Sequence, residues 1–214
     1  MEASFSAREV FVDGDFTPFV PSLGLELFIN QVSRIKAKAA RSFRLPTFND
    51  LYWVSGTDNG NPDLKAEDGL NLELGSHRFS DDWSFTGRLN YTFTRATNEK
   101  VNGTLQANEE GKELIYVPGH QGSASATVNW RNAFLLLNQT YTGQQFTTSD
   151  NNSRWALEAF SLLDIAIGYS TSVRNHTVSI SLRINNVLDQ EYEVRSAYPM
   201  PGINYNLNLN YTFN

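Results

Sequence analysis

The chain has 214 residues, a formal net charge of −6 and no cysteine. The lack of cysteine excludes disulfides and thiolate metal sites, and the negative charge argues against a nucleic-acid partner. Asn, Ser, Thr and aromatic residues are abundant, which favours strands over helices. No apolar run approaches the roughly 20 residues that a membrane-spanning helix needs, whereas a spanning strand needs only about 9–11 residues with every second one apolar.

Ten segments alternate between apolar and polar residues, as half-buried strands do. In segment 133–142 both faces are apolar at first, so the pattern leaves the register of that segment open. In chain order the predicted strands are 4–12, 19–29, 32–41, 68–78, 85–94, 123–130, 133–142, 161–170, 178–185 and 203–213.

The polar positions of these strands are mostly Asn, Ser and Thr, with few charges. In the last segment, for example, Leu207 and Leu209 alternate with Asn206, Asn208 and Asn210. A soluble barrel places apolar side chains inside and charged ones outside, whereas a face of amides and hydroxyls suits a hydrated lumen. Aromatic residues also gather towards the strand ends, as in the girdles of membrane barrels: Tyr91, Phe93, Trp130, Tyr169, Tyr205, Tyr211 and Phe213.

The links between the predicted strands differ in length in a regular way. After a first link around 13–15, short turns alternate with long polar links rich in Gly, Asn and Asp. In an antiparallel meander this gathers the short turns at one end and the long loops at the other, which predicts an all-β transmembrane β-barrel with periplasmic turns and extracellular loops. The short turns are near 30, 80–82, 131–132 and 172–175, and the long links are 43–67, 95–121, 143–160 and 188–202.

Four motifs in fixed order strengthen this interpretation. Residues 41–53 read RSFRLPTFNDLYW, residues 60–67 read GNPDLKAE, residues 116–120 read YVPGH and residues 185–192 read NNVLDQEY. Together with 199–202 and the closing aromatic strand, they resemble the signatures of TonB-dependent outer-membrane receptors. The vitamin B12 and iron-siderophore receptors of that family look most similar.

The resemblance implies a location in the bacterial outer membrane and several partners. Receptors of this family carry a plug domain before a barrel of about 22 strands, whereas ten strands and no plug are predicted here. We therefore expect residues 1–214 to form a single domain, the C-terminal portion of the barrel. The expected partners are outer-membrane lipid, the barrel-assembly machinery, the plug and other strands of the receptor, and TonB through the plug alone.

A ten-strand portion of a larger barrel has two open edges. In lipid, an unpaired backbone N–H or C=O costs several kcal/mol, so open edges are not tolerated there. The chain must therefore close into a narrower barrel, pair with another polypeptide or lie outside a membrane, and the sequence leaves all three alternatives open.

No catalytic or metal site is predicted, and neither enzymatic activity nor a cofactor is expected. The three histidines, His77, His120 and His176, do not form the H-x-x-x-H or H-E-x-x-H arrangements of zinc sites. The sequence GSASA at 122–126 is similar to a nucleophile elbow, but it lies inside an alternating strand instead of a strand-to-helix turn.

Specificity is expected in the long loops, because loops vary while the barrel stays rigid. Aromatic residues there could contact a large, partly apolar ligand. The alternative is that they pack the loops together or lie at the membrane boundary. The candidates are Tyr52, Trp53, Trp155, Tyr192 and Tyr198.

The last predicted strand has a second candidate role. Its alternating apolar and aromatic residues resemble the signal that the barrel-assembly machinery reads during insertion, although the final aromatic is penultimate. The alternative is that these residues are ordinary lipid-facing positions. They are Tyr205, Leu207, Leu209, Tyr211 and Phe213.

The function predicted from the sequence is TonB-dependent uptake of a metal chelate or a cofactor such as a siderophore or cobalamin. Two alternatives stay open. One is a passive small outer-membrane barrel that acts as a pore or an anchor, and the other is a soluble ligand-binding β-barrel.

Overall fold

The computed structural model describes residues 1–12, 15–55, 58–60, 62, 64, 66–97 and 111–213. The predicted turn around 13–15, the motif at 60–67 and the link 95–121 therefore lie partly outside the described residues.

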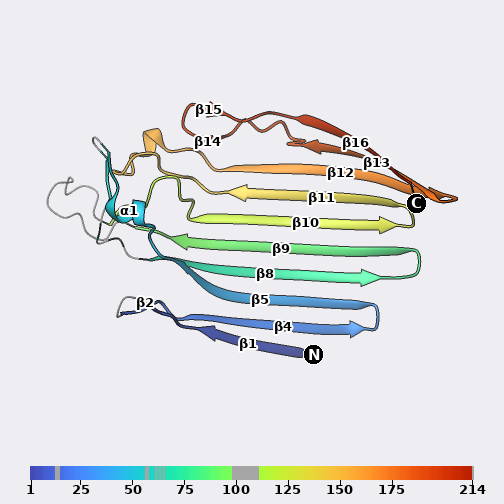
Figure 1. Cartoon of the computed structure of the whole chain (residues 1–214), viewed down its shortest axis with the longest axis horizontal. Coiled ribbons are helices and arrows are strands. Elements are labelled where there is room, and N and C mark those ends of the chain that lie inside the picture. The colour runs from blue at the N-terminus through green and yellow to red at the C-terminus, as the bar shows by residue number, and fades with distance from the viewer. Residues whose placement is uncertain are drawn as a thin grey trace.

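One antiparallel sheet of ten strands dominates the structure (Figure 1), and its spatial order follows the sequence without a crossover. The predicted meander and its ten strands are confirmed. The strands are β1 (Glu2–Arg8), β4 (Val20–Asn30), β5 (Ser33–Arg44), β8 (Glu67–Phe79), β9 (Trp83–Arg95), β10 (His120–Trp130), β11 (Ala133–Thr142), β12 (Phe160–Val173), β13 (His176–Asn185) and β16 (Asn204–Phe213).

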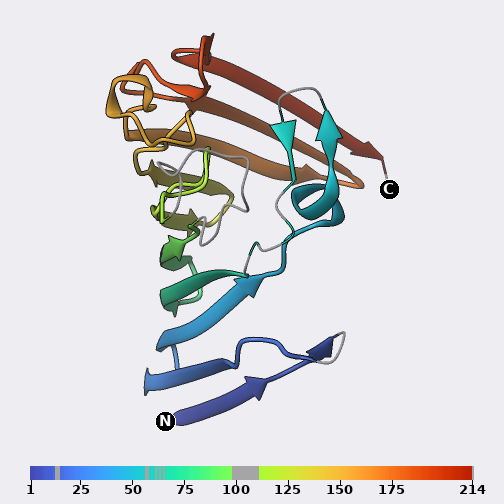
Figure 2. The ribbon, with the colours of Figure 1, turned by 90° about the vertical axis from the view of Figure 1, so that its left-hand side faces the viewer.

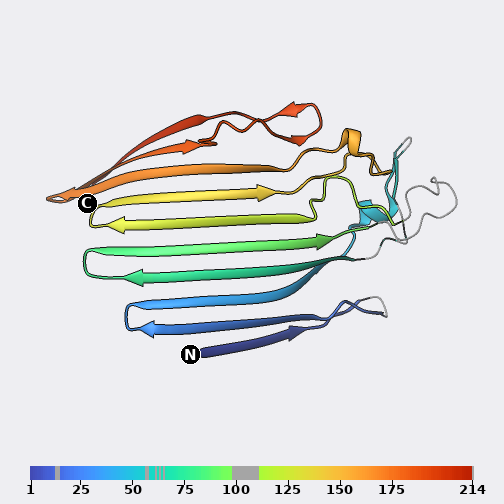
Figure 3. The ribbon, with the colours of Figure 1, turned by 180° about the vertical axis from the view of Figure 1, so that it is seen from behind.

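The shorter elements lie in the links at the end opposite the short turns (Figure 3), which we call the long-loop end. None of the helices in the described ranges is long and apolar enough to cross a bilayer. The elements are β2 (Phe11–Val12), β3 (Asp15–Phe16), α1 (Phe48–Tyr52), β6 (Val54–Ser55), β7 (Asp58–Asn59), the 3₁₀ helix η1 (Ser153–Trp155), β14 (Glu193–Arg195) and β15 (Tyr198–Pro199).

The first predicted strand, 4–12, is divided in two. β1 ends at Arg8, and β2 pairs with β3 instead of with the main sheet. The division follows from Thr17, whose N–H donates to the Val10 carbonyl at 2.7 Å and whose Oγ1 accepts from the Val10 N–H at 3.1 Å. These bonds satisfy the Val10 backbone locally and separate the small hairpin from β1.

The sheet curves into an arc and does not close (Figure 2). At its two ends, β1 pairs only with β4 and β16 only with β13 among the described strands. The small closed barrel that the sequence left open is therefore not the arrangement observed, and the structure has the form of a partial barrel wall.

The register separates two faces across the whole sheet. Asn90, Ser123 and Thr140 lie opposite one another on what we call the polar face, while Leu89 and Ala124 lie on the apolar face. For β11 the register places Leu135 and Leu137 on the apolar face and Phe134 and Leu136 on the polar one, which settles the strand that the pattern left open.

The apolar face is not covered by a second layer. Leu207 and Leu209 are each 69% exposed, and only Ala96, Leu157 and Ala166 are buried apolar residues in the described part of the chain. A soluble sheet of this size would bury its apolar face against another element. The architecture instead presents that face to its surroundings, as a lipid-facing wall does.

Candidate functional site: the polar face and the long-loop end

Amides and hydroxyls on neighbouring strands form short hydrogen-bonded chains across the polar face. Thr92 Oγ1 donates to Asn71 Oδ1 at 3.0 Å, and Asn71 Nδ2 donates to Ser42 Oγ at 2.9 Å. One strand further, Asn90 Nδ2 donates to Ser123 Oγ at 3.0 Å. Such cross-strand pairs form because side chains opposite one another share a face. The result is a neutral surface that is rich in hydrogen-bonding groups.

Charged residues concentrate on the polar face of β4, β5 and β8. Glu26 pairs with Lys36 at 3.0 Å and with Arg34 at 3.6 Å, and Lys38 pairs with Glu73 at 3.7 Å. Lys36, Lys38 and Glu73 have about half of their side-chain surface exposed, so each pair contributes roughly 0–1 kcal/mol. These pairs therefore make a hydrophilic surface more than they stabilise the sheet.

A small group of apolar residues interrupts the polar face between β11 and β12. The Phe134 ring lies against the backbone of Gly168, where an added Cβ would collide with it. Leu136 and the buried Ala166 are next to it, and together with Arg183 they line a cleft of about 480 Å³. The polar face is thus amphipathic at this point.

Asn186 holds the start of the last long loop. Its side chain is buried, accepting from the Gln190 N–H through Oδ1 at 2.9 Å and donating to the Gln190 carbonyl through Nδ2 at 2.9 Å. Its own N–H donates to Asp164 Oδ1 at 2.9 Å. Further along, Asp189 Oδ1 accepts from the Ile203 N–H at 2.8 Å. The sequence NNVLDQEY therefore acts as a clamp on the link between β13 and β16.

Two long links dock on one another at the same end. Asn151 bonds both backbone groups of Glu113, accepting from its N–H at 2.6 Å and donating to its carbonyl at 2.9 Å. Within the second link, Gln145 and Leu157 exchange two backbone bonds, and both residues are buried. These contacts join the described parts of these two links.

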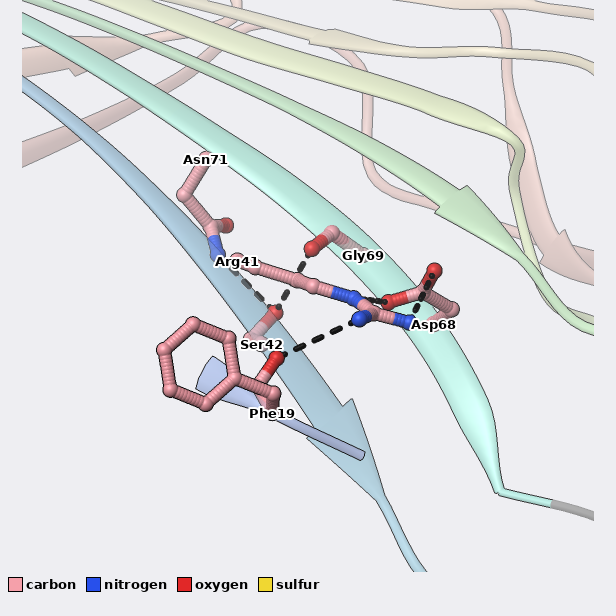
Figure 4. A network of polar contacts seen from close by, with 6 residues as sticks. All are labelled: Phe19, Arg41, Ser42, Asp68, Gly69 and Asn71. Carbon is pink, nitrogen blue, oxygen red and sulfur yellow. Dashed lines mark hydrogen bonds and ion pairs between the residues drawn. The ribbon is translucent and has the colours of Figure 1, made fainter. Parts of the chain in front are cut away.

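The motif that begins at Arg41 ties β5 to its neighbours (Figure 4). Arg41 donates to both carboxylate oxygens of Asp68, at 2.7 and 3.1 Å, and to the Phe19 carbonyl at 3.2 Å. Ser42 points to the other face, where its hydroxyl contacts Gly69 and Asn71. A bidentate guanidinium–carboxylate pair fixes direction as well as distance, so this contact links the side chains of β5 and β8 where the two strands approach the long-loop end.

A family profile described as "TonB dependent receptor-like, beta-barrel" matches residues 3–86 and 76–187. The chain belongs to the TonB-dependent receptor β-barrel family. This family consists of transport receptors, and the resemblance found in the four motifs is confirmed.

Relatives of this receptor barrel are curated as transporters and receptors. The vitamin B12 transporter BtuB of Photobacterium profundum is 25% identical over an alignment of length 226, and the alignment covers 84% of this chain and 35% of that protein. The ferrioxamine B receptor of Salmonella typhimurium is 29% identical over 128 residues, covering 58% of this chain and 17% of the receptor. The chain thus spans about a third of the length of the B12 transporter.

Solved structures show the same fold. The ferric preacinetobactin receptor BauA of Acinetobacter baumannii superposes with a TM-score of 0.58 at 16% identity, over 98% of this chain and 33% of the receptor. The siderophore receptor PiuA of Acinetobacter baumannii gives 0.59 at 16% identity, over 89% of this chain and 28% of that receptor.

The five aromatic candidates of this receptor barrel all lie at the long-loop end but do not form one cluster. Tyr52 ends α1 and contacts Phe48, with ring centroids 5.1 Å apart, and Trp53 follows it. Trp155 lies in η1 with the Arg154 guanidinium 5.4 Å from its ring centroid.

Tyr192 occupies the most enclosed position of the five. It is half-buried against Phe160, at a centroid distance of 4.7 Å, and lines an open cavity of about 680 Å³ with Glu158, Glu191 and Met200. Tyr198 lies on β15, where Arg195 stacks on its exposed ring at 5.6 Å. The structure therefore brings Tyr192 to a cavity, while Tyr198 is not among the residues that line it.

Sequence reasoning missed Phe160 and Glu158 as cavity residues, and it did not assign a task to Asn186 or Arg41. The motifs that contain Asn186 and Arg41 were visible, and the side-chain partner of Asn186, Gln190, lies in the same motif. The partner of the Asn186 N–H, Asp164, lies 22 residues away in sequence, and Asp68, the partner of Arg41, lies 27 residues away. Phe160 and Glu158 lie outside the four motifs, so nothing in the sequence indicated that they line a cavity.

Proposed function

We propose that this chain forms part of the wall of an outer-membrane receptor that takes up a metal chelate or a corrinoid by a TonB-dependent route. The 214 residues would act as one domain, the remaining strands would complete the barrel, and the plug would fill its lumen. The polar face would line the passage, and the long-loop end would face the medium and contact the ligand. TonB would act through the plug.

One observation carries this proposal: a single curved sheet that is apolar and uncovered on one face and hydrophilic on the other. That arrangement suits lipid on one side and water on the other. Family membership supports the transport role, and the relatives named as B12, ferrioxamine and siderophore proteins support the ligand class. A soluble ligand-binding barrel would instead bury its apolar face.

The proposal extends to assembly. β16 presents Tyr205, Leu207, Leu209, Tyr211 and Phe213 on its apolar face, all of them exposed. Tyr211 and Phe213 also pack on His176 of β13, with centroid distances of 5.6 and 5.8 Å. We propose that the barrel-assembly machinery reads this edge strand before the wall is complete.

Uptake of radiolabelled ligands tests the transport role. Cells that express the full natural polypeptide containing these residues would be supplied with labelled cyanocobalamin or labelled ferric siderophores, with and without TonB. We expect accumulation of one ligand class that disappears without TonB. Accumulation that is indifferent to TonB for every ligand would contradict the proposal.

A loop variant tests the placement of the ligand. Tyr192→Ala should raise the apparent KM for uptake roughly two- to tenfold, because a lost aromatic contact is worth about 0.5–1.5 kcal/mol. The matched control is Tyr169→Ala, which removes a half-exposed tyrosine from the apolar face of β12 at the opposite end. Equal effects of the two variants would argue against the cavity at Tyr192.

A further inference from the structure

Two arginines stack on two tryptophans at the short-turn end of the apolar face. Trp83 of β9 and Trp130 of β10 are direct register partners. The Arg78 guanidinium lies 5.5 Å from the Trp83 ring centroid, and that of Arg131 lies 5.8 Å from the Trp130 ring centroid. We call these four residues the Arg–Trp cluster. A guanidinium held over an indole keeps its outer N–H groups available to an anion.

Carboxylates stand beside the cluster in the turn between β8 and β9. Asp82 pairs with Arg131 at 3.3 Å, with both side chains more than 60% exposed. Asp82 also accepts the Arg131 N–H on its backbone carbonyl at 2.8 Å, which ties the two turns together. Asp81 is exposed in the same turn. Arg78 has no ion pair within the described part of the chain. The cluster and the turn thus carry two positive and two negative formal charges.

The cluster is continuous with apolar surface on its other side. Phe85 and Val128 are the next register pair on that face, and Gly87 with Ala126 and then Leu89 with Ala124 follow towards the long-loop end. Trp130 is 60% exposed, so its ring is accessible from outside the sheet. From the sheet centre to the turn, Phe85 and Val128 are followed by the two indoles and then by Arg131 and Asp82 in the turns, while Arg78 of β8 lies level with Phe85.

We infer that the Arg–Trp cluster, with Asp81 and Asp82, binds the head group of a zwitterionic, amine-bearing phospholipid such as phosphatidylethanolamine. The guanidiniums would take the phosphate, the carboxylates the ammonium group, and the acyl chains would lie along Phe85 and Val128. This inference rests on the proposed function, because it requires the apolar face to lie in a membrane.

The balance of charge selects this lipid class. An anionic head group without an amine would satisfy the arginines but compete with Asp82 for Arg131 and offer no donor to either carboxylate, which disfavours it. A quaternary ammonium carries no N–H to donate to Asp81 and Asp82. Phosphatidylethanolamine alone among these three head groups offers both an acceptor phosphate and a donor ammonium.

Native mass spectrometry of the full natural polypeptide, purified in detergent, tests the inference. The protein would be titrated with phosphatidylethanolamine, phosphatidylcholine and phosphatidylglycerol of identical acyl chains. We expect the protein to retain phosphatidylethanolamine at a lower lipid concentration than the other two lipids. Arg78→Gln and Arg131→Asn should each weaken the binding of phosphatidylethanolamine roughly tenfold, which is the effect of losing a charge-assisted hydrogen bond. Asparagine is chosen at position 131 because it tolerates the positive φ of 49° there.

The matched control is Arg174→Asn, another short-turn arginine with a positive φ of 56°, for which no stacked indole is found in the described structure. It should leave retention unchanged. Asp81→Asn should remove the preference for phosphatidylethanolamine over phosphatidylcholine while keeping the arginines intact. The inference is overturned if Arg78→Gln and Arg131→Asn retain the lipid as the wild type does, or if phosphatidylglycerol binds as tightly as phosphatidylethanolamine.

The same titration separates this inference from the proposed function. A protein that retains all three lipids equally would still be a membrane protein without a head-group site. A protein that is monomeric without detergent and retains none of them would overturn both.

Discussion

Phe134 shows how a single side chain can depart from the pattern of its strand. Its ring lies on the polar face and covers Gly168, where any side chain would occupy the space of the ring. Because the backbone of a strand glycine has no side chain to shield it, an aromatic ring from the neighbouring strand fills that space. The glycine and the ring therefore depend on one another.

Gly168→Ala should lower the free energy of unfolding by about 1–3 kcal/mol, because the new methyl group overpacks against the Phe134 ring. Gly75→Ala is the matched control, since it lies on the same face and an added Cβ there meets only the Gly87 carbonyl at 3.8 Å. Urea unfolding of the full natural polypeptide in detergent, followed by heat-modifiable gel migration, measures both. An equal loss in the two variants would show that the ring does not matter.

The sequence could not reveal this pair. The run Phe134-Leu135-Leu136-Leu137 is apolar on both faces, so the choice of face depends on β10 and β12 and not on the run itself. The same holds for Asn186: the motif marked the position, but its task depends on Asp164 and Gln190. Tyr192 was singled out as a candidate because large aromatics in loops are conspicuous, whereas Phe160, which lines the same cavity, was not.

At the scale of elements, the long strands were predictable because the alternation of apolar and polar residues is contained within each segment. Segments 68–78 and 133–142 match β8 and β11 to within one residue at each end. The short elements were not predicted. α1 and the β14–β15 hairpin form in links of mixed composition, where backbone contacts such as the Met200 N–H to the Tyr192 carbonyl at 3.0 Å decide the path.

Two adjacent substitutions in β16 test the assignment of its faces. Leu209→Arg should reduce the folded stability by about 2–4 kcal/mol, the cost of arginine on the lipid face near the bilayer midplane. Asn208→Arg places the same side chain on the polar face and should cost much less. The yield of folded, heat-modifiable protein in the outer membrane compares them. A larger loss for Asn208→Arg would reverse the two faces.

For the whole molecule, the sequence indicated ten strands but not whether they close. Closure depends on whether Glu2–Arg8 and Asn204–Phe213 meet, and no local pattern encodes a contact between the two ends of the chain. The structure leaves both edges unpaired within the described residues. Their backbone groups would be satisfied in a membrane only by further strands.

The isolated 214 residues should therefore not form a steady channel. In planar bilayers the purified chain should give no conductance step of fixed size, because an open wall cannot separate a water-filled lumen from lipid. A complete TonB-dependent receptor barrel from which the plug has been removed serves as the comparison and should conduct. Uniform, long-lived steps from the isolated chain would show that β1 and β16 join.

The neighbour-to-neighbour order of the ten strands has a consequence for how such walls change over time. Since β5 contacts β8 and β8 contacts β9 without any crossover, two consecutive strands and their turn can be gained or lost as one module. The flanking strands can then pair with each other without a change of direction, and each side chain stays on its apolar or polar face. Loss of one strand would reverse every strand after it. The circumference of such a wall is therefore free to evolve in steps of two.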